Sequence, residues 1–272
     1  MIRKNRSTSH RCAFMQTSVL LALTFLLASG PLSARASTEL SDQADKPESA
    51  EAYNQQGLAE LRDGDFEEAG EFFQRAIEAN PDFAPAYVNL GATYNALNRL
   101  EDAVRLLQRA MRIKPTDVEI YCHLGIAYRK MRKHRESLAA YQHALSLNPG
   151  YAEAHNGLGL VYRSMGEHDR AAEAFQRAIE LNPEYTIAYN NLGVEEADLR
   201  HHTQAIDSFE RALRLNPSFS FARFNLAVVY LRMKNRDAAL EQHKILRRTD
   251  RQLADKLYEG IYEGKILNVR DK

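Results

Sequence analysis

Small and apolar residues recur at helical spacing through the central part of the chain, in two stripes within every 34 residues. A short polar turn, such as residues 96–98, separates the two stripes of a unit. The stripes of residues 84–117 consist of Tyr87, Leu90, Gly91 and Tyr94, followed by Ala103, Leu107 and Ala110. Each unit is therefore predicted to form two packed helices. The glycine and alanines let the two backbones approach, and the larger residues fill the space around them.

Prolines, glycines and alanines share the same 34-residue period, and agreement of three residue types indicates a true repeat. They are Pro81, Pro115, Pro149, Pro183 and Pro217; Gly57, Gly91, Gly125, Gly159 and Gly193; and Ala76, Ala110, Ala144, Ala178 and Ala212. Six units fill residues 50–253, with bounds 50–83, 84–117, 118–151, 152–185, 186–219 and 220–253. Four second helices are expected to end at Asn-Pro, because the residue before proline is pushed out of the helical region. Asparagine also tolerates a left-handed exit.

This unit resembles the tetratricopeptide repeat (TPR) family, whose pattern is W-x2-L-G-x2-Y…A-x3-F…P. The fourth unit matches it with His155, Leu158, Gly159, Tyr162, Ala171, Phe175, Ala178 and Pro183. Departures include Glu60 and Glu196 in place of the expected tyrosine, and a sixth unit that lacks several of the consensus residues. The resemblance implies an all-α, right-handed α-solenoid of six helix-turn-helix units. Leu253, Leu257 and Ile261, spaced by four, predict a capping helix within residues 254–272.

The N-terminus has the order of segments that is typical of an export signal. Four cations precede the apolar run Val19–Ala28, and the small-residue site Ala34-Arg35-Ala36 follows it. Residues 1–36 are predicted to be a cleaved signal peptide, and residues 37–49 a polar linker. The alternative is an uncleaved membrane anchor, although a span needs about 20 apolar residues. Both interpretations place the repeats outside the cytoplasm, either periplasmic or secreted, or anchored to the membrane.

Charge and cysteine content argue against nucleic-acid binding and against a disulfide scaffold. The 36 basic residues balance the 36 acidic ones, but five basic residues and no acid lie in residues 1–36, so the rest has a net charge of −5. After cleavage only Cys122 remains of the two cysteines. No familiar catalytic or phosphate-binding motif occurs, so no enzyme activity and no cofactor are expected.

A histidine recurs at one repeat position, as His134, His168 and His202. Equivalent helices in a stack lie roughly 8–10 Å apart, whereas zinc binds a histidine nitrogen at about 2 Å. The three rings are therefore too far apart to share a metal ion, and a packing or surface role is expected.

The TPR resemblance implies that first helices line a concave groove that accepts a peptide or a protein partner. Asparagines recur at two neighbouring groove positions: Asn54, Asn156 and Asn190, and then Asn89, Asn191 and Asn225. An amide both donates and accepts hydrogen bonds, so this ladder suits a backbone clamp, but asparagine at this site also occurs as a structural residue. Cations at the groove are Arg62, Arg129, Lys130, Arg163 and Arg232, with Glu119, Glu153 and Asp198 nearby. Phe221 and Phe224 are candidates either for an apolar anchor or for packing beneath the closing helix.

The sequence thus favours a non-enzymatic adaptor of the bacterial cell envelope that binds a protein or peptide in its groove. Two alternatives stay open. One is an assembly factor for a type IV pilus or a secretion complex, and the other is a regulatory subunit of a glycosyltransferase-type enzyme on another chain.

Overall fold

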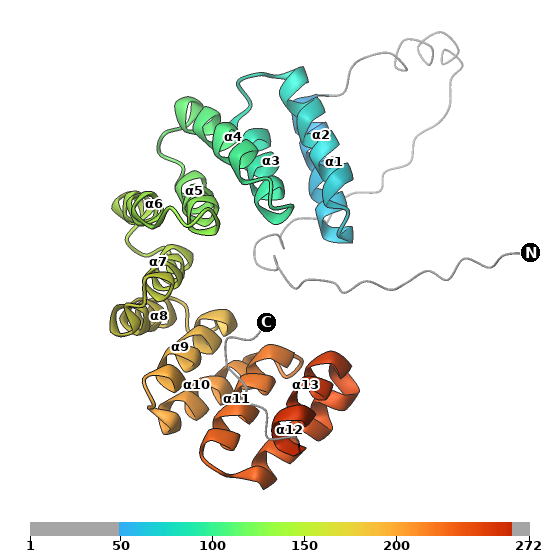
Figure 1. Cartoon of the computed structure of the whole chain (residues 1–272). Coiled ribbons are helices and arrows are strands. Elements are labelled where there is room, and N and C mark those ends of the chain that lie inside the picture. Colours follow the sequence, from blue (N-terminus) through green and yellow to red (C-terminus); the bar gives the residue numbers. More distant parts are fainter. Residues whose placement is uncertain (1–48, 263–272) are drawn as a thin grey trace, which may run out of the picture. The chain divides into compact units, whose positions relative to one another are not determined.

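The computed structural model describes residues 49–262, and this part of the chain consists of thirteen α-helices without a β-strand (Figure 1). The helices are α1 (Ala50–Asp63), α2 (Phe66–Ala79), α3 (Ala84–Ala96), α4 (Leu100–Ile113), α5 (Val118–Lys130), α6 (His134–Leu147), α7 (Ala152–Met165), α8 (His168–Leu181), α9 (Thr186–Asp198), α10 (His202–Leu215), α11 (Ser220–Arg232), α12 (Arg236–Thr249) and α13 (Arg251–Tyr262). The predicted all-α repeat architecture is confirmed. The first helix of each pair begins at the residue where the 34-residue unit begins.

The chain divides into two compact parts at Pro81 and Asp82, and the first part contains one helix pair. The side chain of Ser49 accepts a hydrogen bond from the backbone N–H of Ala52 and caps α1. The α1 helix packs on α2 where Gly57 faces Phe73, because a Cβ atom on Gly57 would lie 2.6 Å from that ring. Of the expected linker, only Ser49 is described, and the predicted signal peptide lies outside the described residues.

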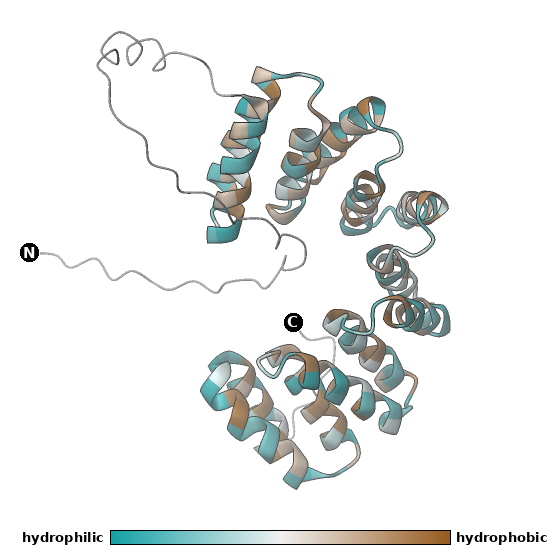
Figure 2. Ribbon diagram, turned by 180° about the vertical axis from the view of Figure 1, so that it is seen from behind, coloured by the Kyte–Doolittle hydropathy of each residue, from teal (hydrophilic) through white to brown (hydrophobic). Residues whose placement is uncertain are grey.

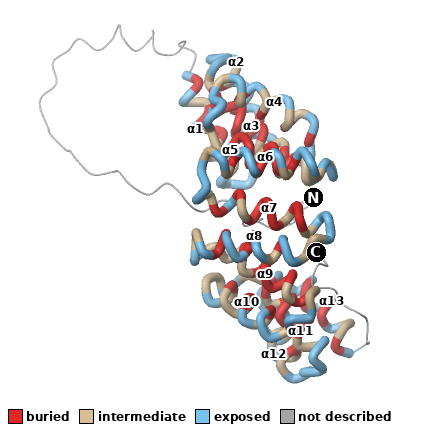
Figure 3. Tube along the Cα trace, turned by 90° about the vertical axis from the view of Figure 1, so that its left-hand side faces the viewer, coloured by how far each residue is buried: buried red, intermediate tan, exposed pale blue. Residues whose placement is uncertain are grey.

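The second part stacks five helix pairs, from α3/α4 to α11/α12, and α13 packs on both α11 and α12. Each second helix contacts the first helix of its own pair and that of the following pair. Hydrophobic and hydrophilic residues alternate around the helices, as expected for helices that each bury one stripe (Figure 2). Because a first helix lies between neighbours, α7 is buried along much of its length, whereas buried and exposed residues alternate along α8 (Figure 3).

A residue in the left-handed conformation separates the two helices of every pair. Glycine occupies this position twice, as Gly64 and Gly166, with φ angles of 92° and 80°. The other four pairs place Asn98, Arg132, Arg200 and Lys234 there, with φ between 59° and 63°. This conformation strains Arg132, Arg200 and Lys234 by roughly 1–2 kcal/mol each, whereas asparagine tolerates it better.

The Asn-Pro exits from the second helices differ from the expectation. Asn148, Asn182 and Asn216 have φ angles of −140°, −135° and −136°, so their backbones are extended and not left-handed. The following proline imposes this region. The side-chain oxygens instead accept hydrogen bonds from the backbone N–H two residues later, at Gly150, Glu184 and Ser218. Asparagine therefore closes the turn with its side chain.

The closing helix α13 buries Leu253, Leu257 and Ile261 against the last repeat, as their spacing predicts. It begins at Arg251, three residues before the expected boundary at 254. The reason is local, since Asp250 Oδ1 accepts a hydrogen bond from the Leu253 N–H at 3.1 Å and caps the new helix. Residues 263–272 of the expected capping segment lie outside the described residues. None of the helices within residues 49–262 is long and apolar enough to span a membrane.

Candidate functional site

The asparagine ladder joins neighbouring first helices to one another. Asn191 Nδ2 of α9 donates to Asn156 Oδ1 of α7 at 2.9 Å, and Asn225 Nδ2 of α11 donates to Asn190 Oδ1 of α9 at 3.0 Å. All four side chains are at most 7% exposed. A buried amide needs partners, and here the adjacent repeat supplies them. This geometry favours the structural role of these four residues over the backbone clamp.

The two remaining members of the predicted ladder lie in different environments. Asn54 of α1 is buried within the first part of the chain, and Asn89 of α3 is half-buried in the second. Arg62, the groove cation expected in α1, donates from Nε to the carbonyl oxygen of Leu58 one turn earlier. The ladder is therefore not one uniform row of exposed amides.

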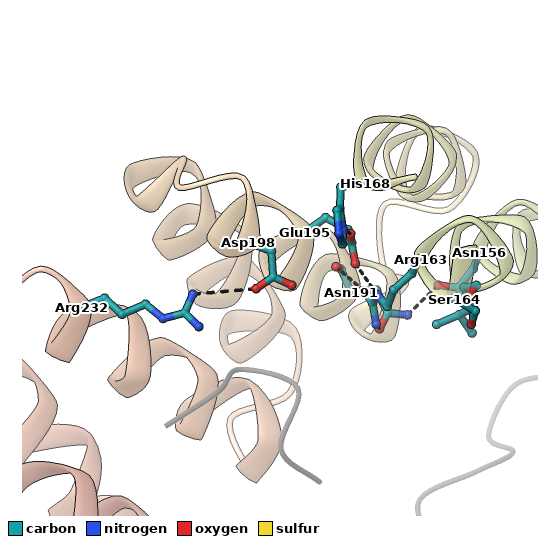
Figure 4. Close-up of polar contacts among 9 residues, drawn as sticks. Asn156, Arg163, Ser164, His168, Asn191, Glu195, Asp198 and Arg232 are labelled. Carbon is teal, nitrogen blue, oxygen red and sulfur yellow. Dashed lines mark hydrogen bonds and ion pairs between the residues drawn. The ribbon is translucent and has the colours of Figure 1, made fainter. Parts of the chain in front are cut away.

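Arg163 is the centre of a buried ionic cluster between the fourth and fifth units (Figure 4). Its Nε pairs with Glu195 Oε1, and its Nη2 donates to the carbonyl oxygen of Asn191 at 2.7 Å. The second carboxylate oxygen of Glu195 lies 2.7 Å from His168 Nδ1. The Glu195 side chain is fully buried and that of Arg163 is 15% exposed, so water screens this ion pair weakly. The cluster connects α7, α8 and α9.

Two other expected groove cations bind carbonyl groups at the C-terminal end of the preceding first helix. Lys130 Nζ of α5 donates to the carbonyl oxygen of Asn95 in α3. Arg232 Nη1 of α11 donates to that of Ala197 in α9 at 3.2 Å and lies 3.9 Å from Asp198 Oδ1 (Figure 4). The last carbonyls of a helix have no partner within the helix and carry its partial negative charge. These two cations therefore help to hold consecutive units in register.

Arg129 lies in a different situation, although it occupies the same repeat position as Arg163. Its Nε is buried and has no hydrogen-bond partner, and the same holds for His134 Nδ1 at the start of α6. Both side chains line a cavity of about 380 Å³, together with Lys130, Arg132 and Ser164. This is a cationic pocket, defined by these five residues, between the third and fourth units.

Acidic side chains mark the opposite end of the same first helices. Glu119 of α5 and Glu153 of α7 are exposed in the first turns. Desolvation raises the pKa of Glu119, the charges of Asp117 and Glu153 raise it further, and the charge of Lys114 partly opposes this. Burial, followed by the charges of Glu153 and Glu119, raises the pKa of the Cys122 thiol to about 12. This thiol is protonated at neutral pH and is a poor nucleophile.

The two phenylalanines of the sixth unit differ in exposure. Phe224 is fully buried in the core formed with α13, and Lys256 Nζ lies 5.8 Å from its ring centroid. Phe221 is 40% exposed. Of the two roles expected for this pair, packing beneath the closing helix fits Phe224, and only Phe221 presents a surface to a partner.

The recurring histidines begin the second helices, at α6, α8 and α10. Within the described residues no group of three or more histidine, cysteine or acidic side chains is placed to hold a metal ion. Sequence reasoning missed the pairing of His168 with Glu195. The available signal was a carboxylate at a position where the other units have small or apolar residues, among them Val161 and Val229.

Family models described as tetratricopeptide repeat match residues 33–82 and 122–186, residues 60–121 and residues 186–219. Together these matches span more than half of the chain. The chain belongs to the tetratricopeptide repeat family. A comparison with curated protein sequences gives no match for this TPR protein.

Solved structures show the same TPR fold. The chain is similar to the crystal structure of the APC/C hetero-tetramer Cut9–Hcn1 (TM-score 0.73, 21% identity), with 82% of this chain and 45% of that one covered, so it spans less than half of that relative. It is also similar to pilF of Pseudomonas aeruginosa (TM-score 0.66, 19% identity, 79% and 97% covered). A third similar structure is YrrB, described as a TPR protein with an unusual peptide-binding site (TM-score 0.50, 26% identity, 69% and 97% covered).

Proposed function

We propose that this TPR protein is an interaction scaffold of the bacterial cell envelope, and that it binds a protein partner along the first helices of its second part. TPR proteins bind protein or peptide partners, and no catalytic family is indicated for this chain. The observation that carries the proposal is the separation of charge along α5 and α7. Glu119 and Glu153 lie at one end of these helices, and the cationic pocket lies at the other.

This separation favours a partner with charges of both signs, because electrostatic complementarity orients a partner and excludes others. The buried asparagine pairs and the Arg163 cluster hold the first helices in a fixed register beneath that surface. A partner therefore meets a preformed surface, and little binding energy is spent on ordering it. The exposed ring of Phe221 is the apolar contact that this proposal assigns to the sixth unit.

The test compares two charge-reversed double variants of the full chain. Glu119→Lys with Glu153→Lys changes the acidic end of the first helices, and Glu101→Lys with Glu173→Lys makes the same change in net charge on exposed positions of second helices. Each protein is immobilised, exposed to envelope extract and crosslinked, and captured proteins are identified by mass spectrometry.

A partner captured by the wild type should be lost from the first-helix variant and retained by the second-helix variant. Equal capture by both variants would show that the partner uses another surface. Location in the envelope is tested separately by N-terminal sequencing of the protein from cell fractions. A chain that starts after Ala36 in the envelope fraction is expected, and an intact N-terminus in the cytoplasmic fraction would contradict this part of the proposal.

A further inference from the structure

The cationic pocket repeats the Arg163 cluster with one member missing. Arg129 and His134 lie 34 residues before Arg163 and His168, at the same repeat positions. The residue 34 positions before Glu195 is Val161, which is fully buried. We call the contact between two consecutive units a joint. The arginine and the histidine are present both at the joint of the third and fourth units and at the joint of the fourth and fifth, whereas the carboxylate is present only at the latter.

The atoms left without partners are the atoms that bind the carboxylate in the neighbouring joint. Arg163 uses Nε and His168 uses Nδ1 to contact Glu195. In the cationic pocket, Arg129 Nε and His134 Nδ1 are buried and unpaired. A buried polar atom without a hydrogen-bond partner is unfavourable, so each such group calls for one. Because the equivalent two nitrogens bind a carboxylate at the next joint, a carboxylate is the partner that fits the cationic pocket.

The surroundings of the cationic pocket add positive charge. Lys130 and Arg132 line it, and burial together with the charge of Arg129 lowers the pKa of Lys130. The α6 helix begins at His134, and Lys133 at its N-cap makes no side-chain hydrogen bond to the helix. Its first N–H groups therefore add a partial positive charge at this end. A cavity of about 380 Å³ leaves room for a carboxylate side chain to enter from solvent.

We infer that the cationic pocket is a binding site for a carboxylate of the partner protein, which takes the position that Glu195 occupies in the next joint. The side chain of an aspartate or glutamate bridges Arg129 Nε and His134 Nδ1. Naming the partner as the source of this carboxylate rests on the proposed function. The existence of the site rests on this chain alone, so a synthetic ligand tests it independently.

The probe is a fluorescein-labelled hexaglutamate peptide with an amidated C-terminus, titrated against the full chain by fluorescence polarisation. Hexaglutamine amide is the neutral comparison, and hexaglutamine with a free C-terminus tests a chain-terminal carboxylate. Arg129→Gln should weaken hexaglutamate binding by about ten- to a hundredfold, the factor that one or two charge-assisted hydrogen bonds contribute. Arg105→Gln is the matched control, because it removes a cation that is 75% exposed on a second helix. It should leave binding unchanged.

Val161→Glu gives the sharpest test, since it supplies the missing carboxylate from the chain itself. This variant should lose hexaglutamate binding as Arg129→Gln does, while its melting temperature stays equal to or above that of the wild type. Val161→Gln is its matched control for stability. It places a side chain of the same size at the same buried position but without the negative charge, so it should melt below Val161→Glu.

Three results would overturn the inference. Hexaglutamate could bind Arg129→Gln and Val161→Glu as tightly as it binds the wild type. Val161→Glu could melt no higher than Val161→Gln. Inorganic phosphate could displace hexaglutamate at far lower concentration than acetate does, which would assign the pocket to a phosphate group. Binding of the free hexaglutamine acid that is lost in Arg129→Gln would support the carboxylate site and identify a chain terminus as a ligand.

Discussion

Neutralising Glu195 should destabilise the joint between the fourth and fifth units. In Glu195→Gln the buried charge of Arg163 loses its counterion, and the acceptor facing His168 Nδ1 becomes an amide. Removing one member of a buried ion pair typically costs about 3–5 kcal/mol of unfolding free energy, because the remaining charge is buried without compensation. Arg163 keeps its bond to the Asn191 carbonyl, and His168 is 32% exposed, so the lower half of that range is expected.

Urea unfolding followed by circular dichroism measures the change in free energy. Stability in a repeat array is approximately a sum of unit and interface contributions, so hydrogen exchange should locate the loss in α7, α8 and α9. Glu180→Gln is the matched control, since it removes an exposed pair with Arg177 that is worth about 0–1 kcal/mol. If Glu195→Gln changes the free energy no more than Glu180→Gln does, the cluster does not stabilise the joint.

Three further predictions concern other contacts. Replacing Asn191 and Asn225 by alanine should lower the stability measured in urea by roughly 2–6 kcal/mol, because each leaves a buried amide oxygen unpaired; unchanged stability with weaker partner binding would restore the clamp role. Gly125→Leu should cost roughly 1–3 kcal/mol or more, since a Cβ atom there lies 2.7 Å from the Tyr141 ring; an unchanged melting temperature would contradict this packing. Burial lowers the pKa of His123 from 6.5 to about 4. The unfolded chain therefore binds the proton first, and stability should fall by up to about 3 kcal/mol between pH 6.5 and 4. His123→Gln should remove that part of the pH dependence in melts recorded across this range.

The repeat period predicted the pairs of helices, because small and large residues recur in phase along the first five units. It could not predict the partners of polar side chains. Whether Asn191 meets a ligand or Asn156 depends on how neighbouring units are rotated against each other, and no single unit encodes that rotation. The capping role of Lys130 was hidden for the same reason, since its acceptor is a backbone carbonyl 35 residues earlier.

The Asn-Pro exits show a limit of a different kind. Asparagine can either adopt the left-handed conformation or accept a hydrogen bond from the backbone two residues later. The proline that follows excludes the first, because it restricts the preceding residue to the extended region. In the cationic pocket, by contrast, the sequence contains the signal once the cluster around Glu195 is known. When the units are aligned, Val161 falls at the position of Glu195. The joint between the third and fourth units therefore lacks the carboxylate that the next joint contains.

The contact of Tyr141 with two glycines has a consequence for how such an array can change its length. The ring lies against Gly125 of its own unit and Gly157 of the next, where a Cβ atom would be 2.2 Å away. Deleting residues 152–185 would bring Asn191 to the place of Gly157, and its side chain would collide with the ring. Deleting residues 186–219 would instead bring Val229 opposite Arg163 and leave that guanidinium without its carboxylate. The units look alike in sequence, but each is fitted to its own neighbour, so recombination that removes a whole repeat does not yield an equivalent shorter protein.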